Sequence, residues 1–252
     1  MNEQVTIGIA SIPERISCLK AALESLLPQL GRDDTVTVYL NGYDTVPDWM
    51  ARPDMVGNII PVLSSCSGPG DTGDAGKFYG LNRCDSGYYF ALDDDYIYPP
   101  TFIQDSIAAA EKYDRQAAVS LHGWDAKPNQ ASYHRDRAHT YHYKHDVPQD
   151  TPVHIMATNT LCFHRSLLPN LSIDDFKRPN MADLWFSMYC NERGVRRIVR
   201  AHGSKYIKDA EYDKQQSIWA RFSRSPEKER FQTDTLNGVV WDKGTSIKSK
   251  AA

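Results

Sequence analysis

The sequence predicts an α/β fold, with a mostly parallel sheet flanked by helices and followed by a C-terminal helical or irregular extension. Two observations favour this fold class. Short apolar, β-branched runs alternate with longer segments whose apolar residues recur at helical spacing, as in repeated strand and helix units. Several of the runs end in Gly, Asn, Asp or Ser, which close strands in turns. We expect one domain over residues 1–208 and an extension over 209–252 that packs on it.

The first expected unit is a strand followed by an amphipathic helix. Residues 5–10 (VTIGIA) are short and β-branched, and residues 11–30 carry leucine and alanine at helical spacing. Ser11 and Glu14, with Pro13 between them, fit a capping box. We therefore expect the loop after the first strand to open directly into a helix N-terminus, a kind of end that attracts anions.

The other expected elements continue the alternation of strands and helices. Strands are expected over residues 35–42, 58–65, 87–95, 117–121 and 153–164 and within 195–207, and helices over 99–113 and 181–194. The Gly- and Asp-rich segment 66–84 is expected to be a ligand loop that leads into a short helix. The aromatic, histidine-rich segment 122–150 is longer than a connector needs to be, so it is expected to serve a site. The extension is expected to form one helix and an arm from its few apolar residues, Ile218, Trp219, Phe222, Phe231 and Trp241.

Composition excludes several classes of protein. The 29 basic and 32 acidic residues are interspersed, which argues against a nucleic-acid partner. No apolar run reaches the roughly eighteen residues of a membrane span, and the start of the chain does not resemble a signal peptide. We expect a cytoplasmic protein, with a peripheral position at the inner membrane face as the second expectation. The five cysteines are widely spaced and form no CxxC, so we expect reduced thiols rather than disulfides or a zinc knuckle.

Three aspartates, Asp93 to Asp95, end the apolar run YYFAL. Alternation along a strand would place Asp93 and Asp95 on one face and Asp94 on the other. Two unit charges ~4 Å apart repel by ~1 kcal/mol in water and ~4 kcal/mol at an effective dielectric near 20, which a divalent cation would reverse. Magnesium commonly takes one or two carboxylates and completes its shell with water and phosphate oxygens. Because parallel sheets bind ligands at the carboxyl ends of strands, we expect a metal-bound phosphate compound here. The alternative is a solvated acidic turn before Pro99.

With these motifs in place, residues 5–205 resemble the GT-A fold nucleotide-sugar glycosyltransferases, especially a family-2-like group of bacterial and phage enzymes. The resemblance rests on VTIGIASIPER at the first strand, VYLNG at the second, FALDDD as a DxD motif, and MADLWF as an acidic motif that opens a helix. It implies a Rossmann-like GT-A fold and bound Mn²⁺ or Mg²⁺. It also implies Asp93 and Asp95 as metal ligands, with His202 joining them, and Asp183 as the general base.

The resemblance extends to the nucleotide-sugar donor. It implies donor contacts from Ser11, Pro13, Arg15, Asn41, Asp71, Asp74, Lys77, Asp93, Asp94 and Lys205. Plain structural roles stay open beside these: Arg15 could pair on the surface with Glu14 or Asp33, Asp183 could cap its helix, and His202 could be structural. Family members often carry two acidic residues where this chain has Ala182 and Asp183, which leaves Asp174 and Asp175 as alternative bases.

The function that follows is transfer of a sugar from a nucleotide donor, with a UDP-sugar favoured, to a hydroxyl of a glycan or other acceptor, with inversion. A carboxylate would take the acceptor proton and a cation would stabilise the leaving diphosphate. In segment 122–150, Tyr133, Tyr141 and Tyr143 are interleaved with Arg135 and Arg137 and are expected to contact a sugar or an anionic acceptor, and Trp124 is expected to offer a stacking face. One alternative is a nucleotidyltransferase, although SIPER is a poor match to its Gly-rich loop. The other is a non-catalytic metal-binding or adaptor protein that uses His134, His139, His142 and His145.

Overall fold

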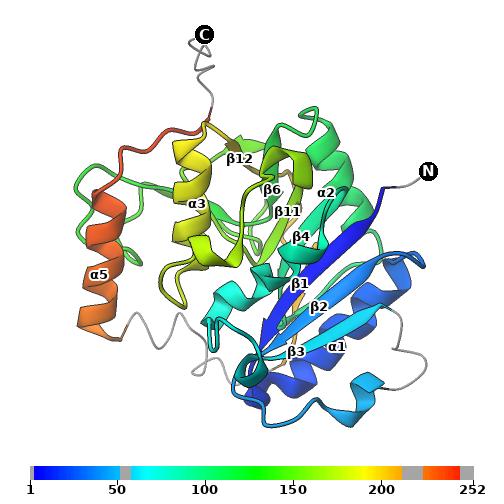
Figure 1. The fold of residues 1–252 in the computed structure, drawn as a ribbon. Helices are drawn as coiled ribbons and strands as arrows, with labels where there is room; N and C mark the ends of the chain where they lie inside the picture. The colour runs from blue at the N-terminus through cyan, green and yellow to red at the C-terminus, as the bar shows by residue number, and fades with distance from the viewer. Residues whose placement is uncertain (1–2, 52–57, 212–223, 245–252) are drawn as a thin grey trace.

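An eight-stranded sheet forms the centre of the molecule in the computed structural model, which describes residues 3–51, 58–211 and 224–244 (Figure 1). Its strands are β1 (Val5–Ser11), β2 (Thr35–Leu40), β3 (Ile59–Leu63), β4 (Tyr88–Asp93), β6 (Ala117–Ser120), β9 (Thr151–Pro152), β11 (Thr160–His164) and β12 (Arg196–Val199). Their order is β3-β2-β1-β4-β11-β6-β12-β9. Only β11 and β9 run antiparallel to the others. The predicted α/β fold with a mostly parallel sheet is confirmed.

The remaining elements cover this sheet or extend from it. The helices are α1 (Ile16–Leu26), α2 (Phe102–Glu111), α3 (Ala182–Glu192) and α5 (Pro226–Asn237), together with the long 3-10 segment η5 (Gly73–Arg83). Short 3-10 turns lie at Pro13–Arg15, Leu27–Gln29, Asp48–Ala51, Ser64–Cys66, Arg165–Leu167 and Ile173–Asp175. A three-stranded sheet contains β10 (Ile155–Met156), β7 (Gly123–Asp125) and β8 (His139–Tyr141), and β13 (Lys208–Asp209) pairs with β5 (Tyr96–Ile97).

The two faces of the sheet are buried under different elements. On β4, Phe90 and Leu92 belong to the core that contains α1 and α2, whereas Tyr89 and Ala91 belong to the core that contains η5 and α3. Successive side chains of a strand point to opposite faces, so both sets must be apolar. This explains why the run before the aspartates is continuously hydrophobic. Burial on both sides fixes β4, and therefore fixes the place where its acidic end emerges.

Close approach of η5 to β1 requires a glycine at position 8. A Cβ atom at Gly8 would lie 1.8 Å from the carbonyl oxygen of Lys77 and 2.5 Å from the hydroxyl of Tyr89. Since both obstacles lie in the packed layer over the sheet, Gly8→Ala is expected to lower the free energy of unfolding by about 3 kcal/mol, at the upper end for overpacking. Urea unfolding followed by circular dichroism measures this. Gly68→Ala is the control, because its Cβ would meet no atom within 4 Å; equal stability of the two variants would contradict the prediction.

Three sequence expectations are wrong in detail. Ser11 and Glu14 form no capping box, because Ile12 is the N-cap of the Pro13–Arg15 turn and no side chain caps it. The strand expected to reach Asp95 ends at Asp93 and is followed by a turn. The strand expected over 153–164 divides into β10 and β11, which belong to different sheets. Between β10 and β11, Thr158 donates hydrogen bonds to Asp183, and Asn159 donates one to Tyr96.

The extension contributes the helix α5, as expected. Leu236 of α5 lies in an apolar cluster with Trp124, Tyr133 and Met181 of the main body. Ile218, Trp219 and Phe222, which were expected to take part in such packing, lie outside the described residues. The boundary at residue 208 stays a prediction. All five cysteines are free thiols, and Cys66 alone among them is exposed. None of the helices that the structure describes combines the length and the apolar character needed to cross a membrane.

Candidate functional site

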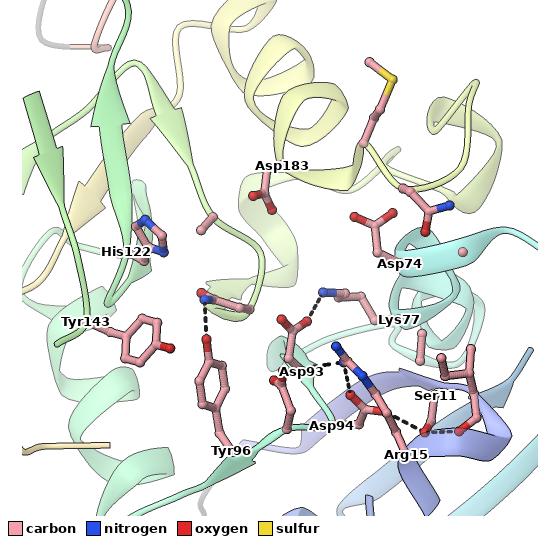
Figure 2. A pocket seen from close by; sticks show the side chains of 18 of the residues that line it. Ser11, Arg15, Asp74, Lys77, Asp93, Asp94, Tyr96, His122, Tyr143 and Asp183 are labelled. Atoms are coloured by element: carbon pink, nitrogen blue, oxygen red, sulfur yellow. Dashed lines mark hydrogen bonds and ion pairs between the residues drawn. The ribbon is translucent and has the colours of Figure 1, made fainter. Parts of the chain in front are cut away.

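A cavity of about 500 Å³ lies at the carboxyl ends of β1 and β4. Every predicted site residue except Pro13, His202 and Lys205 lines it. The predicted residues brought together there are Ser11, Arg15, Asn41, Asp71, Asp74, Lys77, Asp93, Asp94, Asp95 and Asp183. They come from segments far apart in the sequence, and Figure 2 shows many of their side chains converging on one space. The cavity is the candidate active site.

The three aspartates are held by two cationic side chains. Asp93, the last residue of β4, forms an ion pair with Lys77 of η5. Asp94 is buried and accepts hydrogen bonds from the Ser11 hydroxyl at 2.5 Å and from Arg15 at 2.7 Å. The same guanidinium nitrogen of Arg15 lies 3.5 Å from an Asp95 oxygen.

These contacts correct the expected alternation of the aspartates. Because β4 ends at Asp93, Asp94 and Asp95 lie in a turn and share Arg15, instead of pointing to opposite faces. All three aspartates line the cavity. Arg15 is therefore a cavity residue, and not the surface partner of Glu14 or Asp33 that the sequence left open.

Lys77 is a buried cation surrounded by acidic groups. Its side chain is only 4% exposed. Burial lowers the pKa of Lys77, but the charges of Asp93, Asp74 and Asp183 outweigh it and hold that pKa above its usual value. Lys77 therefore stays protonated at neutral pH and supplies a fixed positive charge at the centre of the acidic wall.

Asp74 connects η5 to the start of α3. One of its oxygens accepts the backbone N–H of Ala182, at 3.1 Å, which satisfies a donor at the N-terminus of α3. Burial raises the pKa of Asp74 to about 7, and the charge of Asp183 adds to the rise while Lys77 and the Ala182 N–H oppose it. Asp74 thus titrates near neutral pH. The N-terminus of α3 and η5 are joined through this carboxyl group.

Asp183 lies in the first turn of α3 but does not cap the helix, since Met181 occupies the N-cap position. Its Oδ1 accepts both the backbone N–H and the hydroxyl of Thr158, each at 2.8 Å. No residue in the described part of the chain donates a hydrogen bond to Oδ2. Burial raises the pKa of Asp183, and Lys77 and the Thr158 donors oppose that rise. One oxygen is therefore fixed, and the other is available to a ligand in the cavity.

The far wall of the cavity comes from segment 122–150 and from α5. Trp124, Tyr133 and Arg137 line it, as does Gln232 of α5. The open stacking face expected at Trp124 is not present, because the Arg137 guanidinium covers that ring at 4.4 Å from its centroid. Trp124 itself is only 2% exposed. Of the residues of this segment expected to contact an acceptor, Tyr133, Tyr143 and Arg137 line the cavity, and Tyr141 and Arg135 do not. Their role toward an acceptor stays a prediction.

Five further lining residues were not predicted individually: Tyr96 and Asn180 were not singled out, and His122, Asn159 and Met181 were included only as members of longer segments. His122 follows β6, and burial lowers its pKa well below the usual value, so it is neutral. Asn159 precedes β11, which runs antiparallel and so brings its N-terminal end to the edge where β4 ends. The signal that could have found them is the strand order, because a reversed strand presents its beginning at the ligand edge.

Three predicted residues lie elsewhere. Pro13 is exposed in the turn before α1. His202 forms a backbone bridge with Val147, and its Nδ1 lies 2.7 Å from the Arg200 carbonyl oxygen. Lys205 lines a separate, shallow hollow with Lys144 and Lys208. The structure does not bring these side chains to the acidic triplet, so their donor and metal roles stay predictions.

The charge of the cavity wall bears on the expected metal ion. Six carboxylates line the cavity, from Asp71, Asp74, Asp93, Asp94, Asp95 and Asp183, against the cations Arg15, Lys77 and Arg137. An acidic wall repels a diphosphate unless a further cation accompanies it. In the described residues, no cluster of three or more His, Cys, Asp or Glu side chains could hold a metal by itself. The all-oxygen set of Asp93 and Asp95 fits Mg²⁺ or Mn²⁺ that is completed by water and phosphate oxygens.

Known proteins resemble this chain in structure, with little similarity in sequence. No protein-family model matches the chain, and no curated protein matches it. The chain is similar in structure to residues 1–349 of TarS from S. aureus, a glycosyltransferase, with 12% sequence identity and a TM-score of 0.49. The alignment covers 94% of this chain and 69% of that chain.

Proposed function

We propose that the protein is a metal-dependent glycosyltransferase that transfers a sugar from a nucleotide donor, a UDP-sugar favoured, to an acceptor hydroxyl with inversion. One observation carries the proposal. Asp183, with one oxygen fixed and the other available, shares a single cavity with the acidic triplet and its cations. Figure 2 shows the Asp183 carboxyl group on one side of this space and the Lys77 and Asp93 pair on the other. The cavity therefore holds a candidate base, Asp183, apart from Lys77, a cation that can bind phosphate.

The donor half of the proposal rests on the end of the cavity formed by β1, β4 and η5. At about 500 Å³ the cavity has the size of an ordinary small-molecule site. Lys77 and Arg15 are cations that can pair with diphosphate oxygens, and Asn41, whose Oδ1 is buried without a partner in the described residues, can bind a ribose or base group. Asp93 and Asp95 would hold the metal ion. When bound, such an ion would neutralise charge that develops on the leaving diphosphate.

The transfer step of the proposed reaction depends on Asp183. The acceptor oxygen forms a bond to the anomeric carbon of the donor sugar while the bond from that carbon to the diphosphate oxygen breaks, and the electron pair leaves with the diphosphate. The acceptor proton passes to Oδ2 of Asp183. Burial raises the pKa of this carboxyl group, which makes it a stronger base than an exposed aspartate. A single base facing the donor from the acceptor side is what an inverting displacement requires.

Thermal unfolding with and without ligands tests the donor site. UDP with Mn²⁺ is expected to raise the midpoint of the wild type, because a ligand at 100 times its dissociation constant stabilises by about 2.7 kcal/mol. Asp95→Ala is expected to lose most of this shift, since it removes a carboxylate from the phosphate end of the cavity. Asp174→Ala is the matched control, because Asp174 is exposed and does not line the cavity. If no nucleoside diphosphate with Mn²⁺ or Mg²⁺ moves the wild-type midpoint, the proposed function fails.

A further inference from the structure

Arg137 lies on the far wall of the cavity, opposite Arg15 and Lys77 in the proposed donor site, and is held in a defined position. It comes from the segment between β7 and β8 and lines the cavity. Its Nε donates a hydrogen bond to the Tyr133 carbonyl oxygen at 3.1 Å. The guanidinium group lies over two rings, 4.4 Å from the centroid of Trp124 and 5.7 Å from that of Tyr133. Stacking on Trp124 and Tyr133 fixes the plane of the guanidinium group and therefore the directions of its terminal N–H groups.

Arg137 differs from the other two cations of the cavity in its partners. Arg15 pairs with Asp94 and Asp95, and Lys77 pairs with Asp93. Arg137 forms no ion pair with any residue that the structure describes, and its terminal NH₂ groups donate no hydrogen bond to one. Burial lowers the pKa of Arg137 and the negative charge of Asp183 opposes this, and a guanidinium keeps its charge at neutral pH.

A partly buried cation without a carboxylate partner is costly, and a ligand anion can offset that cost. Gln232 of α5 is 3% exposed and lines the cavity together with Arg137 and His134. Its side-chain amide can donate to a further oxygen. A guanidinium fork beside an amide suits a group with several acceptor oxygens, and phosphate is the common group of that kind.

We propose that the acceptor carries a phosphate group, which Arg137 binds beside Asp183 while the reacting hydroxyl faces the base. This inference rests on the proposed function, because it names the class of acceptor that the same cavity takes. It assigns Arg137 as the residue that selects phosphorylated acceptors over neutral ones. The donor diphosphate is held at the opposite end, by Arg15 and Lys77, so the two anions occupy separate places.

Calorimetric titration with inorganic phosphate tests the proposal on the full chain, with the donor end first saturated by UDP and Mn²⁺. The wild type is expected to bind phosphate under these conditions, and Arg137→Gln is expected to bind it at least about tenfold more weakly, as for loss of one charge-assisted hydrogen bond. Arg137→Met is the second variant, because its aliphatic side chain still covers the Trp124 ring if the glutamine variant folds poorly. Arg135→Gln, a change at a neighbouring exposed arginine, is expected to bind phosphate as the wild type does.

Three results of the phosphate titration would overturn the inference. Phosphate binding that UDP and Mn²⁺ abolish would mean that only the donor end takes anions. Equal phosphate affinity in the wild type and both Arg137 variants, or no binding by the wild type, would remove Arg137 as a phosphate ligand. Failure of the proposed function is a separate result: if UDP and Mn²⁺ do not bind, the difference in phosphate affinity between the wild type and the Arg137 variants still reports on Arg137.

Discussion

Replacing Asp183 by Asn is expected to lower kcat for sugar transfer by about 10²- to 10⁴-fold, the range of a lost general base. The amide oxygen of Asn can accept the same two hydrogen bonds from Thr158 that Oδ1 accepts now, so the start of α3 keeps its position. What the variant loses is the carboxylate that takes the acceptor proton. Donor binding is expected to stay within about twofold of the wild type, because Arg15 and Lys77 at the other end of the cavity are unchanged.

Two measurements separate a base from a structural residue. The transfer rate at saturating donor gives the chemical effect, and the UDP titration in the presence of Mn²⁺ gives the donor affinity. Asp174→Asn is the control, since Asp174 was the alternative base on sequence grounds and is exposed outside the cavity. A large loss of transfer rate in the Asp174 variant, with none in the Asp183 variant, would make Asp174 the general base instead of Asp183. Loss of both transfer and nucleotide binding in Asp183→Asn would mean that the residue supports the fold instead.

The sheet could be predicted from the sequence because its strands are marked locally. The runs 5–10, 35–42 and 58–65 are short, β-branched and closed by turn residues, and each is a strand of the structure. Burial of both faces of β4 makes its sequence continuously apolar, so the emergence of Asp93 at the ligand edge was visible as a change from apolar to acidic residues. These signals are local in the sequence and can be recognised without knowing which strands are neighbours in the sheet.

The partners of the acidic residues could not be predicted, because they depend on strand order. β1 lies beside β4, and this adjacency brings Ser11 and Arg15 to Asp94 across more than seventy residues of chain. Sequence spacing suggested instead that Ser11 caps the helix that follows it. A hydroxyl can satisfy either donor or acceptor groups nearby, and here the buried carboxylate of Asp94 is the partner.

The division of segment 153–164 has a similar cause. Its residues have strand propensity throughout, but a strand is also shaped by the polar groups that it must satisfy. Thr158 donates two hydrogen bonds to Asp183 and Asn159 donates one to Tyr96, and the chain turns between β10 and β11 where these contacts are made. The break is therefore part of the site, since it fixes the orientation of the proposed base.

Replacing Lys77 by Met is expected to lower the free energy of unfolding by about 3–5 kcal/mol at neutral pH, the cost of breaking a buried ion pair. The Lys77 side chain is 4% exposed, and Met can occupy the space of its apolar stem but not its charge. Asp93, Asp74 and Asp183 would then share the cavity wall without the cation that all three face. The Asp93 side chain is 30% exposed and can still be hydrated, which favours the lower end of the range.

The loss in Lys77→Met is expected to be smaller in acid than in base. The pKa of Asp74 in the folded protein is about 7, above its ordinary value of 3.8, so its contribution to stability is fully present below 3.8 and is lost as pH rises through 7. Without Lys77 the pKa values of Asp74 and Asp183 rise further, and both groups hold their protons to higher pH. Urea unfolding in EDTA at about pH 5 and about pH 8 measures the difference. Lys127→Met, which breaks an exposed pair with Asp136, is the control and is expected to change little at either pH. A Lys77 variant as stable as this control, or one that loses more stability in acid, would mean that Lys77 does not hold the acidic wall together.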